Sequence, residues 1–354
     1  MASNGHTNGH GDGREAQPAQ KMSALRFALY NFSSQWFLLP QGTGILSIIL
    51  HQLDYQFRGL AIISQILWVL TIVLLLGFLV IYLARTCVFP AMVRQQLQTN
   101  IMETACLSSI SIAFTTIIQM IVLNVVREWS RGWGVAALGL WWINTALATI
   151  ACIGIPYILA TLEAPGIDSL QPSILLPAIS ALTLAAGGGV ICRYGELNAS
   201  LQLPVIVVSY LAIGMALPLS LACIAIFLAR FTNKSWPVGH TAYSLMLLCG
   251  PFGQGSFALQ ILGDCVQRTA FYGYNTSSFL HTDAGKIVAT SSELLGLLTW
   301  GFGTFWWAFA CIALVHYFVV DRKSMMGWDQ DLGFWSIVFP WVSETCFLGE
   351  IEQN

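Results

Sequence analysis

Long apolar runs recur along this 354-residue chain and decide its fold class. An α-helix needs about 20 apolar residues to cross the hydrocarbon core of a bilayer. Only 9% of the residues are charged, whereas a soluble domain carries roughly 25%. The chain is therefore predicted to be an all-α polytopic membrane protein. The expected spans are residues 36–52, 60–84, 102–124, 134–160, 173–192, 201–229, 240–264 and 288–319, followed by a partial ninth span that begins at 332.

Polar sequence borders this apolar part at both ends. Residues 1–22 are rich in Gly, Asn, His and Gln, and are expected to form a disordered tail. The transmembrane domain is assigned to residues 23–348 and a short C-terminal tail to residues 349–354. The nine cysteines are scattered without a Cys-x-x-Cys pair, which favours small packing residues over a disulfide or metal site. We expect no metal and no cofactor.

The distribution of Lys and Arg among the expected loops predicts the orientation. With the N-terminus in the cytoplasm, nine basic residues fall inside and six outside, so the positive-inside rule favours this orientation. The sequons at Asn198 and Asn275 then lie outside, where glycosylation occurs. The outside set consists of Arg58, Arg127, Arg131, Arg193, Arg268 and Lys286, and the inside set includes Arg85.

Glycine and proline interrupt some of the expected spans. The stretch Cys249–Phe257 places three glycines and a proline inside the span 240–264. Irregular backbone at membrane depth is tolerated only where it is buried in protein or lines a water-filled cavity, because each unpaired backbone group in lipid costs several kcal/mol. We therefore expect this stretch to face inward, at a pore. Pro40 in the first span and Pro177 in the fifth, which also contains Gly187–Gly189, repeat the pattern.

The interruptions fall mainly in odd-numbered spans. The third span has no proline, but it carries several hydroxyl side chains, whereas the sixth span, with Pro204 and Pro218, breaks the rule. The simplest fold is a set of helical hairpins whose odd members form an inner ring around a central pore and whose even members form an outer ring. The alternative is that the glycines allow helices to pack closely, as small residues commonly do in membranes.

Polar and small residues on the odd spans are the candidate anion contacts. An anion must be able both to enter and to leave, which favours hydrogen-bond donors over a strong fixed charge. Each hydroxyl in this set has the alternative of bonding to its own helix backbone. The candidate pore-lining residues are Thr43, Gly44, Ser108, Thr115, Gly188, Phe252, Gln254 and Ser256.

Ionisable residues are scarce in the spans. Glu103 is a candidate for proton coupling, but Asn100–Glu103 has the spacing of a capping box, which favours a helix cap at the membrane interface. Asp264 stands at the end of a span and is also expected at the interface. We expect no ionisable residue deep in a span, where it would indicate a functional site.

Four sequence blocks resemble the tellurite-resistance/dicarboxylate transporter family, which includes plant slow anion channels, fungal malic acid transport proteins and fungal sulfite efflux pumps. Gly42–Ile45 resembles the M-G-T-G-I block of the sulfite-pump branch, with Gln41 in place of Met. Gly214–Leu221 and Gly250–Gly263 resemble its sixth- and seventh-helix blocks, and Phe334–Pro340 its W-W-x-x-T-F-P signature. The likeness extends from about residue 35 to residue 340, with the blocks in the family's order.

The resemblance implies ten helices as five hairpins around a central pore, a homotrimer, and passage of a small anion. Two departures stand out. The gating phenylalanine that precedes the family signature is replaced by Gln330, with Trp328 two residues earlier. Only fourteen residues follow Pro340, so the family fold is expected here without its tenth helix.

Sequence and resemblance together predict a plasma-membrane protein that exports sulfite or an organic acid anion such as malate. A polytopic membrane enzyme is the alternative from another class, but the clustered acidic residues that such an enzyme needs for a metal-bound diphosphate are missing. A truncated, non-conducting relative is a third reading. The expected partners are the anion, the lipid bilayer and further copies of the chain, and nucleic acid is not expected.

Overall fold

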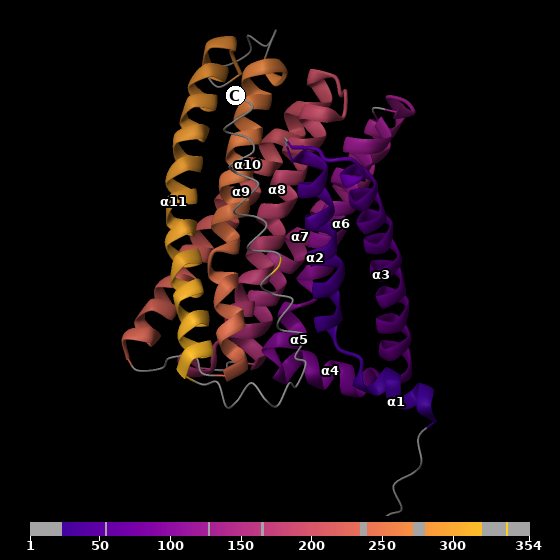
Figure 1. The fold of residues 1–354 in the computed structure, drawn as a ribbon, viewed down its shortest axis with the longest axis vertical. Coiled ribbons are helices and arrows are strands. Elements are labelled where there is room, and N and C mark those ends of the chain that lie inside the picture. Colours follow the sequence, from indigo (N-terminus) through magenta and orange to yellow (C-terminus); the bar gives the residue numbers. More distant parts are fainter. Residues whose placement is uncertain are drawn as a thin grey trace, which may run out of the picture.

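The computed structural model describes residues 23–53, 55–126, 128–163, 166–233, 239–271, 280–320 and 338, and these form a helical bundle (Figure 1). Both terminal tails, the gate positions Trp328 and Gln330, and the ninth span apart from residue 338 lie outside the described residues.

Four antiparallel hairpins build the bundle. Three short helices lie at the end of the bundle where the chain enters it: α1 (Ala24–Asn31), α4 (Pro90–Thr99) and α5 (Ile101–Ala105) (Figure 1). The hairpins are α2 (Leu38–Gln52) with α3 (Leu60–Val88), α6 (Ser108–Met120) with α7 (Gly132–Ile158), α8 (Leu176–Tyr194) with α9 (Ala199–Thr232), and α10 (Gly250–Cys265) with α11 (Thr282–Val320). Each of the eight expected spans coincides with one of these helices. Seven segments meet the length and apolar composition of a membrane span, and α2, with 15 residues, is the shorter one.

The first helix of each hairpin lies inside the bundle and the second outside. The most apolar window is 94% buried in the segment of α8 and 100% buried in that of α10, against 17% in α3 and 22% in α11. The inner helices contact one another in the order α2, α6, α8, α10. The predicted alternation of enclosed and exposed helices is therefore confirmed.

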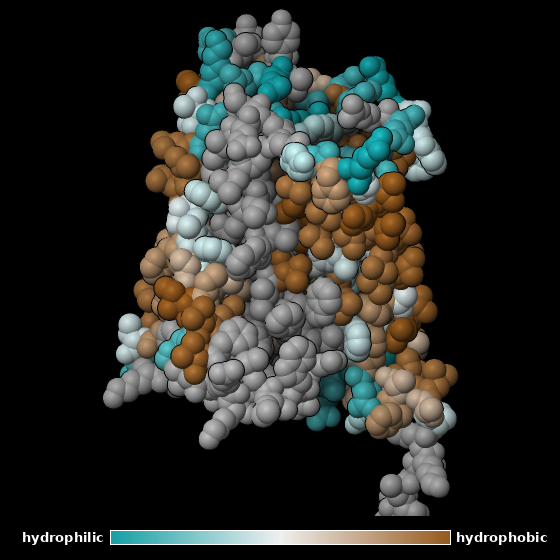
Figure 2. Space-filling model, viewed as in Figure 1, coloured by the Kyte–Doolittle hydropathy of each residue, from teal (hydrophilic) through white to brown (hydrophobic). Residues whose placement is uncertain are grey.

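The outer helices expose a hydrophobic surface. Along α3 the exposed side chains include Ile62, Ile66, Val73, Leu76 and Val80. Figure 2 shows brown, hydrophobic side chains over the flank formed by α3, with hydrophilic residues gathered toward the end above it. Such a broad apolar surface is unfavourable in water and suits contact with lipid.

The Gly-rich stretch Cys249–Phe257 is helical, so the expected non-helical break there is wrong. Its glycines lie in regular α-helix from Gly250 onward, and every residue of α10 is buried. The irregular backbone comes earlier, as a 3-10 helix at Gly239–Leu248. Pro251 explains the boundary, because proline is favoured in the first helical turn, where its missing N–H is not needed.

Prolines also stand at the start of two other inner helices. Pro177 is the second residue of α8, after a 3-10 turn at Pro172–Leu175. Pro40 is the third residue of α2, after a 3-10 turn at Ser34–Phe37. The inner prolines thus begin helices rather than interrupt them.

Candidate functional site

The four candidate hydroxyl residues each donate to a backbone carbonyl three or four residues earlier in the chain, which for Ser108 is at the end of the preceding helix α5. Ser108 Oγ donates to Ala105 O at 2.5 Å, and Ser256 Oγ donates to Gly253 O at 2.8 Å. Thr43 Oγ1 donates to Leu39 O at 3.1 Å and shares a 2.9 Å hydrogen bond with Thr71 Oγ1 of α3. The alternative considered for these hydroxyls, a hydrogen bond to the nearby helix backbone, is therefore the arrangement that the structure shows.

Thr115 belongs to a hydrogen-bonded contact between α6 and α7. Its Oγ1 donates to Ser111 O at 3.0 Å and accepts from Asn144 Nδ2 at 2.7 Å. Ser111 Oγ donates to Asn144 Oδ1 at 2.9 Å. Asn144 lies on α7 and is completely buried. This cluster joins an inner helix to an outer one. In the sequence, the feature that indicates it is Asn144, an amide inside an otherwise apolar span.

The candidate glycines lie where helices approach closely. A Cβ added to Gly44 would lie 3.0 Å from Thr116 Cβ of α6. A Cβ added to Gly188 would clash with Ser209 and lie 3.0 Å from Trp141 Cζ2. Trp141 and Ser209 belong to α7 and α9, so Gly188 faces outer helices, and its expected place on a pore surface is not supported. These glycines serve close packing.

Phe252 and Gln254 have different surroundings, although both are buried. The Phe252 ring packs edge-on against Phe302 of α11, with 4.7 Å between centroids. Gln254 lies seven residues before Ile261 and hence on the same face of α10, the face that contacts Gly189 of α8. Its Nε2 has no hydrogen-bond partner among the described residues.

Other amides on the inner helices share this feature. Buried oxygens of Gln41 on α2 and Gln119 on α6 also have no partner among the described residues. An amide enclosed in protein without a partner costs about 1–3 kcal/mol, so it points to a function or to a missing ligand or water. A glutamine within an apolar span is the sequence signal for both residues, and Gln41 was not among the predicted site residues.

Helix contacts place Gln41 and Gln254 at similar depth in the bundle. The close contacts between neighbouring helices show which residues lie at the same height along the bundle axis. Counted from those contacts at about 1.5 Å per residue, the heights of Gln41 and Gln254 differ by about one helical turn, roughly 5 Å. The contacts used are Gly44–Thr116, Gly187–Thr115 and Gly189–Ile261. Gln260 differs, because its Cγ lies beside Gly296 of α11, on another side of α10.

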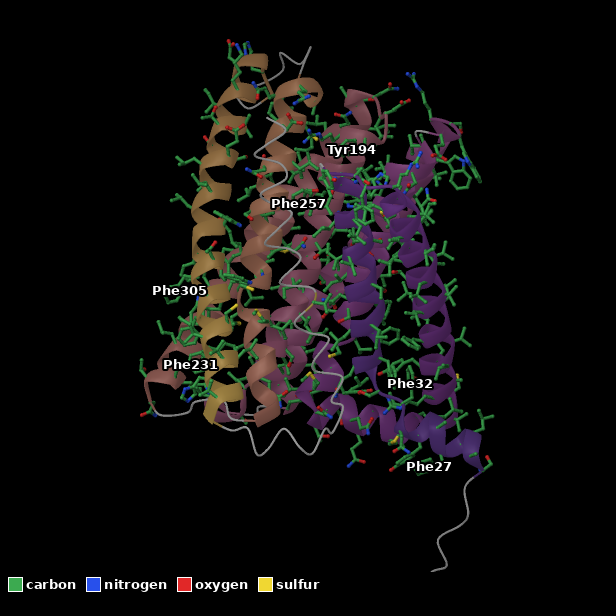
Figure 3. All side chains as sticks on the ribbon, viewed as in Figure 1. Phe27, Phe32, Tyr194, Phe231, Phe257 and Phe305 are labelled. Atoms are coloured by element: carbon green, nitrogen blue, oxygen red, sulfur yellow. The ribbon has the colours of Figure 1, made fainter. Side chains whose placement is uncertain are left out.

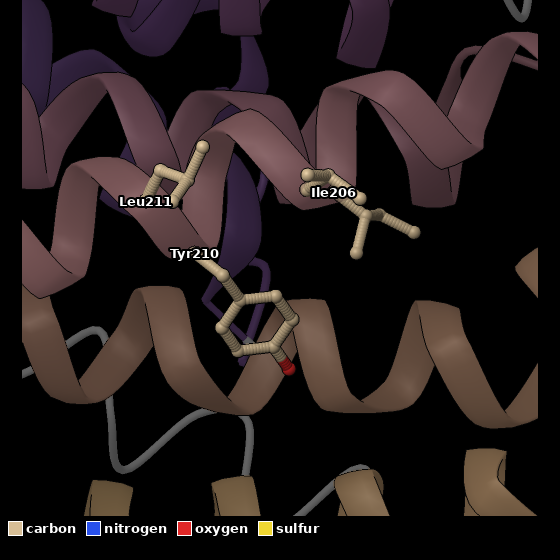
Figure 4. A pocket seen from close by; sticks show the side chains of 4 residues that line it. Ile206, Tyr210 and Leu211 are labelled. Carbon is tan, nitrogen blue, oxygen red and sulfur yellow. The ribbon is translucent and has the colours of Figure 1, made fainter. Parts of the chain in front are cut away.

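A surface pocket on α9 lies away from this interior. It is lined by Ile206, Val207, Tyr210 and Leu211 (Figure 4). The Tyr210 hydroxyl forms a 2.7 Å hydrogen bond with Ser292 Oγ of α11. Because the lining is otherwise apolar and faces the outer helices, this pocket does not suit a small hydrophilic anion.

The four inner helices run in the same direction. Each begins at the end of the bundle where α1 and α5 lie and finishes at the opposite end (Figure 1). Each helix carries roughly half a positive charge at its N-terminus and half a negative charge at its C-terminus. The end near α1 is therefore the one whose helix dipoles attract anions.

A buried ion pair stands at this same end. Arg85 Nη1 of α3 lies 2.5 Å from Glu103 Oε1 of α5, and both side chains are almost inaccessible. Glu103 Oε2 also accepts hydrogen bonds from Ser33 Oγ at 2.7 Å and Ser34 N at 3.0 Å. Asn100 caps α5 as predicted, since its Oδ1 accepts from the backbone N–H of residues 102 and 103.

The position of this pair corrects one expectation. Arg85 lies within helix α3 and not in a loop, and Glu103, at the same end of the bundle, is buried in protein. The two charges neutralise each other, and the extra hydrogen bonds to Glu103 offset part of the cost of removing it from water. Because both carboxylate oxygens are occupied, Glu103 is arranged as a structural partner rather than as an open proton carrier.

A second charged cluster lies at the opposite end, on the inner helices. Asp264 Oδ1 of α10 accepts from Arg268 Nε at 2.5 Å, and Asp264 Oδ2 lies 3.6 Å from Arg193 Nη1 of α8. Asp264 is at a helix end, as expected, but its side chain is only 9% exposed. Neither arginine was singled out as a site residue.

Helices enclosed by an apolar, lipid-facing shell, with polar groups in the interior and few charges, define a polytopic membrane protein. The sequence profile of the voltage-dependent anion channel family (SLAC1) matches residues 31–351. Among curated proteins, the sulfite efflux pump SSU1 of Arthroderma benhamiae is 31% identical over 88% of this chain and 80% of its own length.

Two further relatives agree. The sulfite efflux pump SSU1 of Trichophyton rubrum is 30% identical over 88% of this chain and 80% of its own length. An uncharacterized transporter of Methanocaldococcus jannaschii is 22% identical over 88% of this chain and 82% of its own length. This chain belongs to the voltage-dependent anion channel (SLAC1) family and is an anion channel or transporter. Members of this family are not enzymes, which removes the enzyme alternative.

Proposed function

We propose that this chain exports sulfite through the space between its inner helices. The observation that carries the proposal is Gln254, an amide enclosed within α10 whose Nε2 has no hydrogen-bond partner among the described residues. Gln41 lies at similar depth on α2 and supports it. The relatives with the highest identities given above are named sulfite efflux pumps.

The chemistry of these groups suits a permeating anion. An amide N–H donates to a sulfite oxygen without contributing a full charge, so the anion is stabilised in the interior but not trapped. Between the charged ends, the described parts of α2, α6, α8 and α10 carry no Asp, Glu, Lys or Arg. Parallel helix dipoles attract an anion to the end near α1, where the inner helices begin.

This interior favours sulfite over malate. Malate carries two carboxylates separated by a carbon chain, and its recognition is best served by guanidinium groups that bind carboxylates in pairs. The described inner helices hold none between their ends. Compact sulfite, with oxygens on a single sulfur atom, needs only a few nearby donors.

We also propose that the protein sits in the plasma membrane with its N-terminus in the cytoplasm, as a homotrimer. The distribution of basic residues supports this orientation. In it, the anion-attracting end near α1 faces the cytoplasm, as export requires. Gln330 and Trp328 remain the proposed gate positions by resemblance, and cross-linking of the purified protein tests the trimer.

Flux of anions from proteoliposomes tests the transport proposal. Vesicles loaded in parallel with sulfite, malate, chloride or nitrate are compared, and we expect sulfite to leave fastest. Gln254→Leu should lower sulfite flux at least about ten-fold, because losing a hydrogen bond to an anion is worth roughly 1.5–3 kcal/mol.

Gln260→Leu is the matched control, since it removes the same amide from the same helix but from the side that faces α11. Equal loss of flux in both variants would show a general effect on α10 and contradict the assignment of Gln254. A wild-type protein that carries malate faster than sulfite would contradict the substrate, and one that carries no anion would contradict the function.

A further inference from the structure

The charged cluster at the far end of the inner helices has a geometry that suits an anion. Tyr194, the neighbour of Arg193, lies at the end of the bundle opposite Phe27 and Phe32 (Figure 3). Arg193 and Arg268 meet there around the single carboxylate of Asp264. Two guanidinium groups thus lie beside one carboxylate.

Tight helix contacts hold this cluster in place. A Cβ at Gly189 of α8 would lie 3.3 Å from Ile261 Cβ of α10, so the two helices approach closely just below the cluster. Cys265 Sγ also donates to Gly189 O at 3.5 Å. The backbone segments that carry Arg193, on α8, and Arg268, just after α10, are thus held close together.

The two arginines place positive charge beside the C-terminal ends of the inner helices. An anion that moves along the inner helices reaches their C-terminal ends, where each contributes roughly half a negative charge. Those ends repel the departing anion unless positive charge stands beside them. Among the charged residues of the described inner segments, Arg193 and Arg268 are the positive charges at this end.

Asp264 prevents the cluster from holding the anion too tightly. Its Oδ1 accepts a hydrogen bond from Arg268 Nε, while its Oδ2 has no hydrogen-bond partner among the described residues. The carboxylate is therefore a built-in competitor that a passing anion displaces only in part. Binding that is strong enough for entry but weak enough for release is what conduction requires.

We propose that Arg193, Asp264 and Arg268 form the release site for the exported anion. The inference rests on the proposed function and adds the residues that receive the anion after the amides of the interior. The ligand is a small oxyanion such as sulfite. More than half of the Arg268 side chain is accessible, at 58%, so an anion can reach this guanidinium.

Sulfite flux from proteoliposomes tests the proposal with charge-neutralising variants. Arg268→Gln should lower flux about five-fold, the factor expected when one exposed charge in contact with an anion is lost. The loss should shrink as inert potassium gluconate is added, because salt screens accessible charges. Asp264→Asn should lower the sulfite concentration at half-maximal flux and also lower the maximal rate, since release becomes slower.

Arg131→Gln is the matched control. Arg131 lies at the same end, before α7, and its Nε lies 2.7 Å from Glu196 Oε2 in an exposed ion pair outside the inner helices. Its neutralisation should leave flux unchanged. Because Arg268 is exposed, Arg268→Gln should fold normally, and the midpoint of thermal unfolding in detergent verifies this. The flux of Arg268→Gln therefore tests the release site even if Asp264→Asn does not accumulate.

The outcomes separate this inference from the proposed function. Flux in the wild type that is unchanged in Arg268→Gln, or reduced equally in Arg131→Gln, would overturn the release site alone. A wild-type protein without anion flux would overturn the proposed function and the release site with it. A salt-dependent loss in Arg268→Gln but not in Arg131→Gln supports both.

Discussion

Replacing Gly188 by alanine tests whether the glycines of α8 serve packing. The new Cβ would clash with Ser209 and lie 3.0 Å from Trp141 Cζ2 and 3.1 Å from Val205 Cγ1. Trp141 cannot easily move, since it is completely buried and its Nε1 donates to Leu184 O at 3.0 Å. Overpacking of this kind costs about 1–3 kcal/mol.

Gly214→Ala on α9 provides the matched comparison, because no described residue lies within 4 Å of a Cβ added there. Both variants gain up to about 1 kcal/mol of helix propensity, so the difference between them isolates the packing cost of about 1–3 kcal/mol. At about 2–4 °C per kcal/mol, Gly188→Ala should melt several degrees below Gly214→Ala in a thermal assay of purified protein. Equal melting temperatures would refute close packing at Gly188, and reduced sulfite flux at an unchanged melting temperature would instead place it on the anion pathway.

Two further predictions concern buried polar contacts. Glu103→Gln should destabilise the protein by about 3–5 kcal/mol, because it leaves the Arg85 guanidinium buried without its counter-charge. The recovery of folded protein and its melting temperature measure this loss. An unchanged melting temperature would contradict the ion pair. Asn144→Leu should cost about 1 kcal/mol, the usual worth of an interhelical hydrogen bond in a membrane protein, since it loses bonds to Ser111 and Thr115. The same melting assay measures it, and the control is Thr145→Val on α7, whose hydroxyl donates to Trp141 O of its own helix.

The sequence predicts the helices and their inner or outer position well, because both depend on local composition. An outer helix such as α3 faces lipid along much of its length and needs little besides apolar side chains. An inner helix such as α10 must admit close neighbours on all sides, which requires Gly and small residues. The composition of a segment therefore predicts whether its helix lies inside or outside the bundle.

Contacts between segments are harder to predict. Arg85 and Glu103 are separated by α4, and no helical spacing connects them, so only the tertiary fold shows that they form a pair. The same holds for Arg193 and Asp264, which lie on different hairpins. Each charge taken alone has the sequence appearance of an interfacial residue, because interfacial and buried charges both occur near the ends of apolar segments.

The triplet Gly187–Gly189 shows how a local pattern can carry tertiary information once its geometry is considered. Successive residues on an α-helix point about 100° apart, so three adjacent glycines cover nearly the whole circumference. In the structure, Gly187 faces α6, Gly188 faces α7 and α9, and Gly189 faces α10. A helix that packs against one neighbour needs small residues only every third or fourth position. Three consecutive glycines within an apolar span therefore indicate a helix that is surrounded on all sides, which is the position of α8 between its inner and outer neighbours.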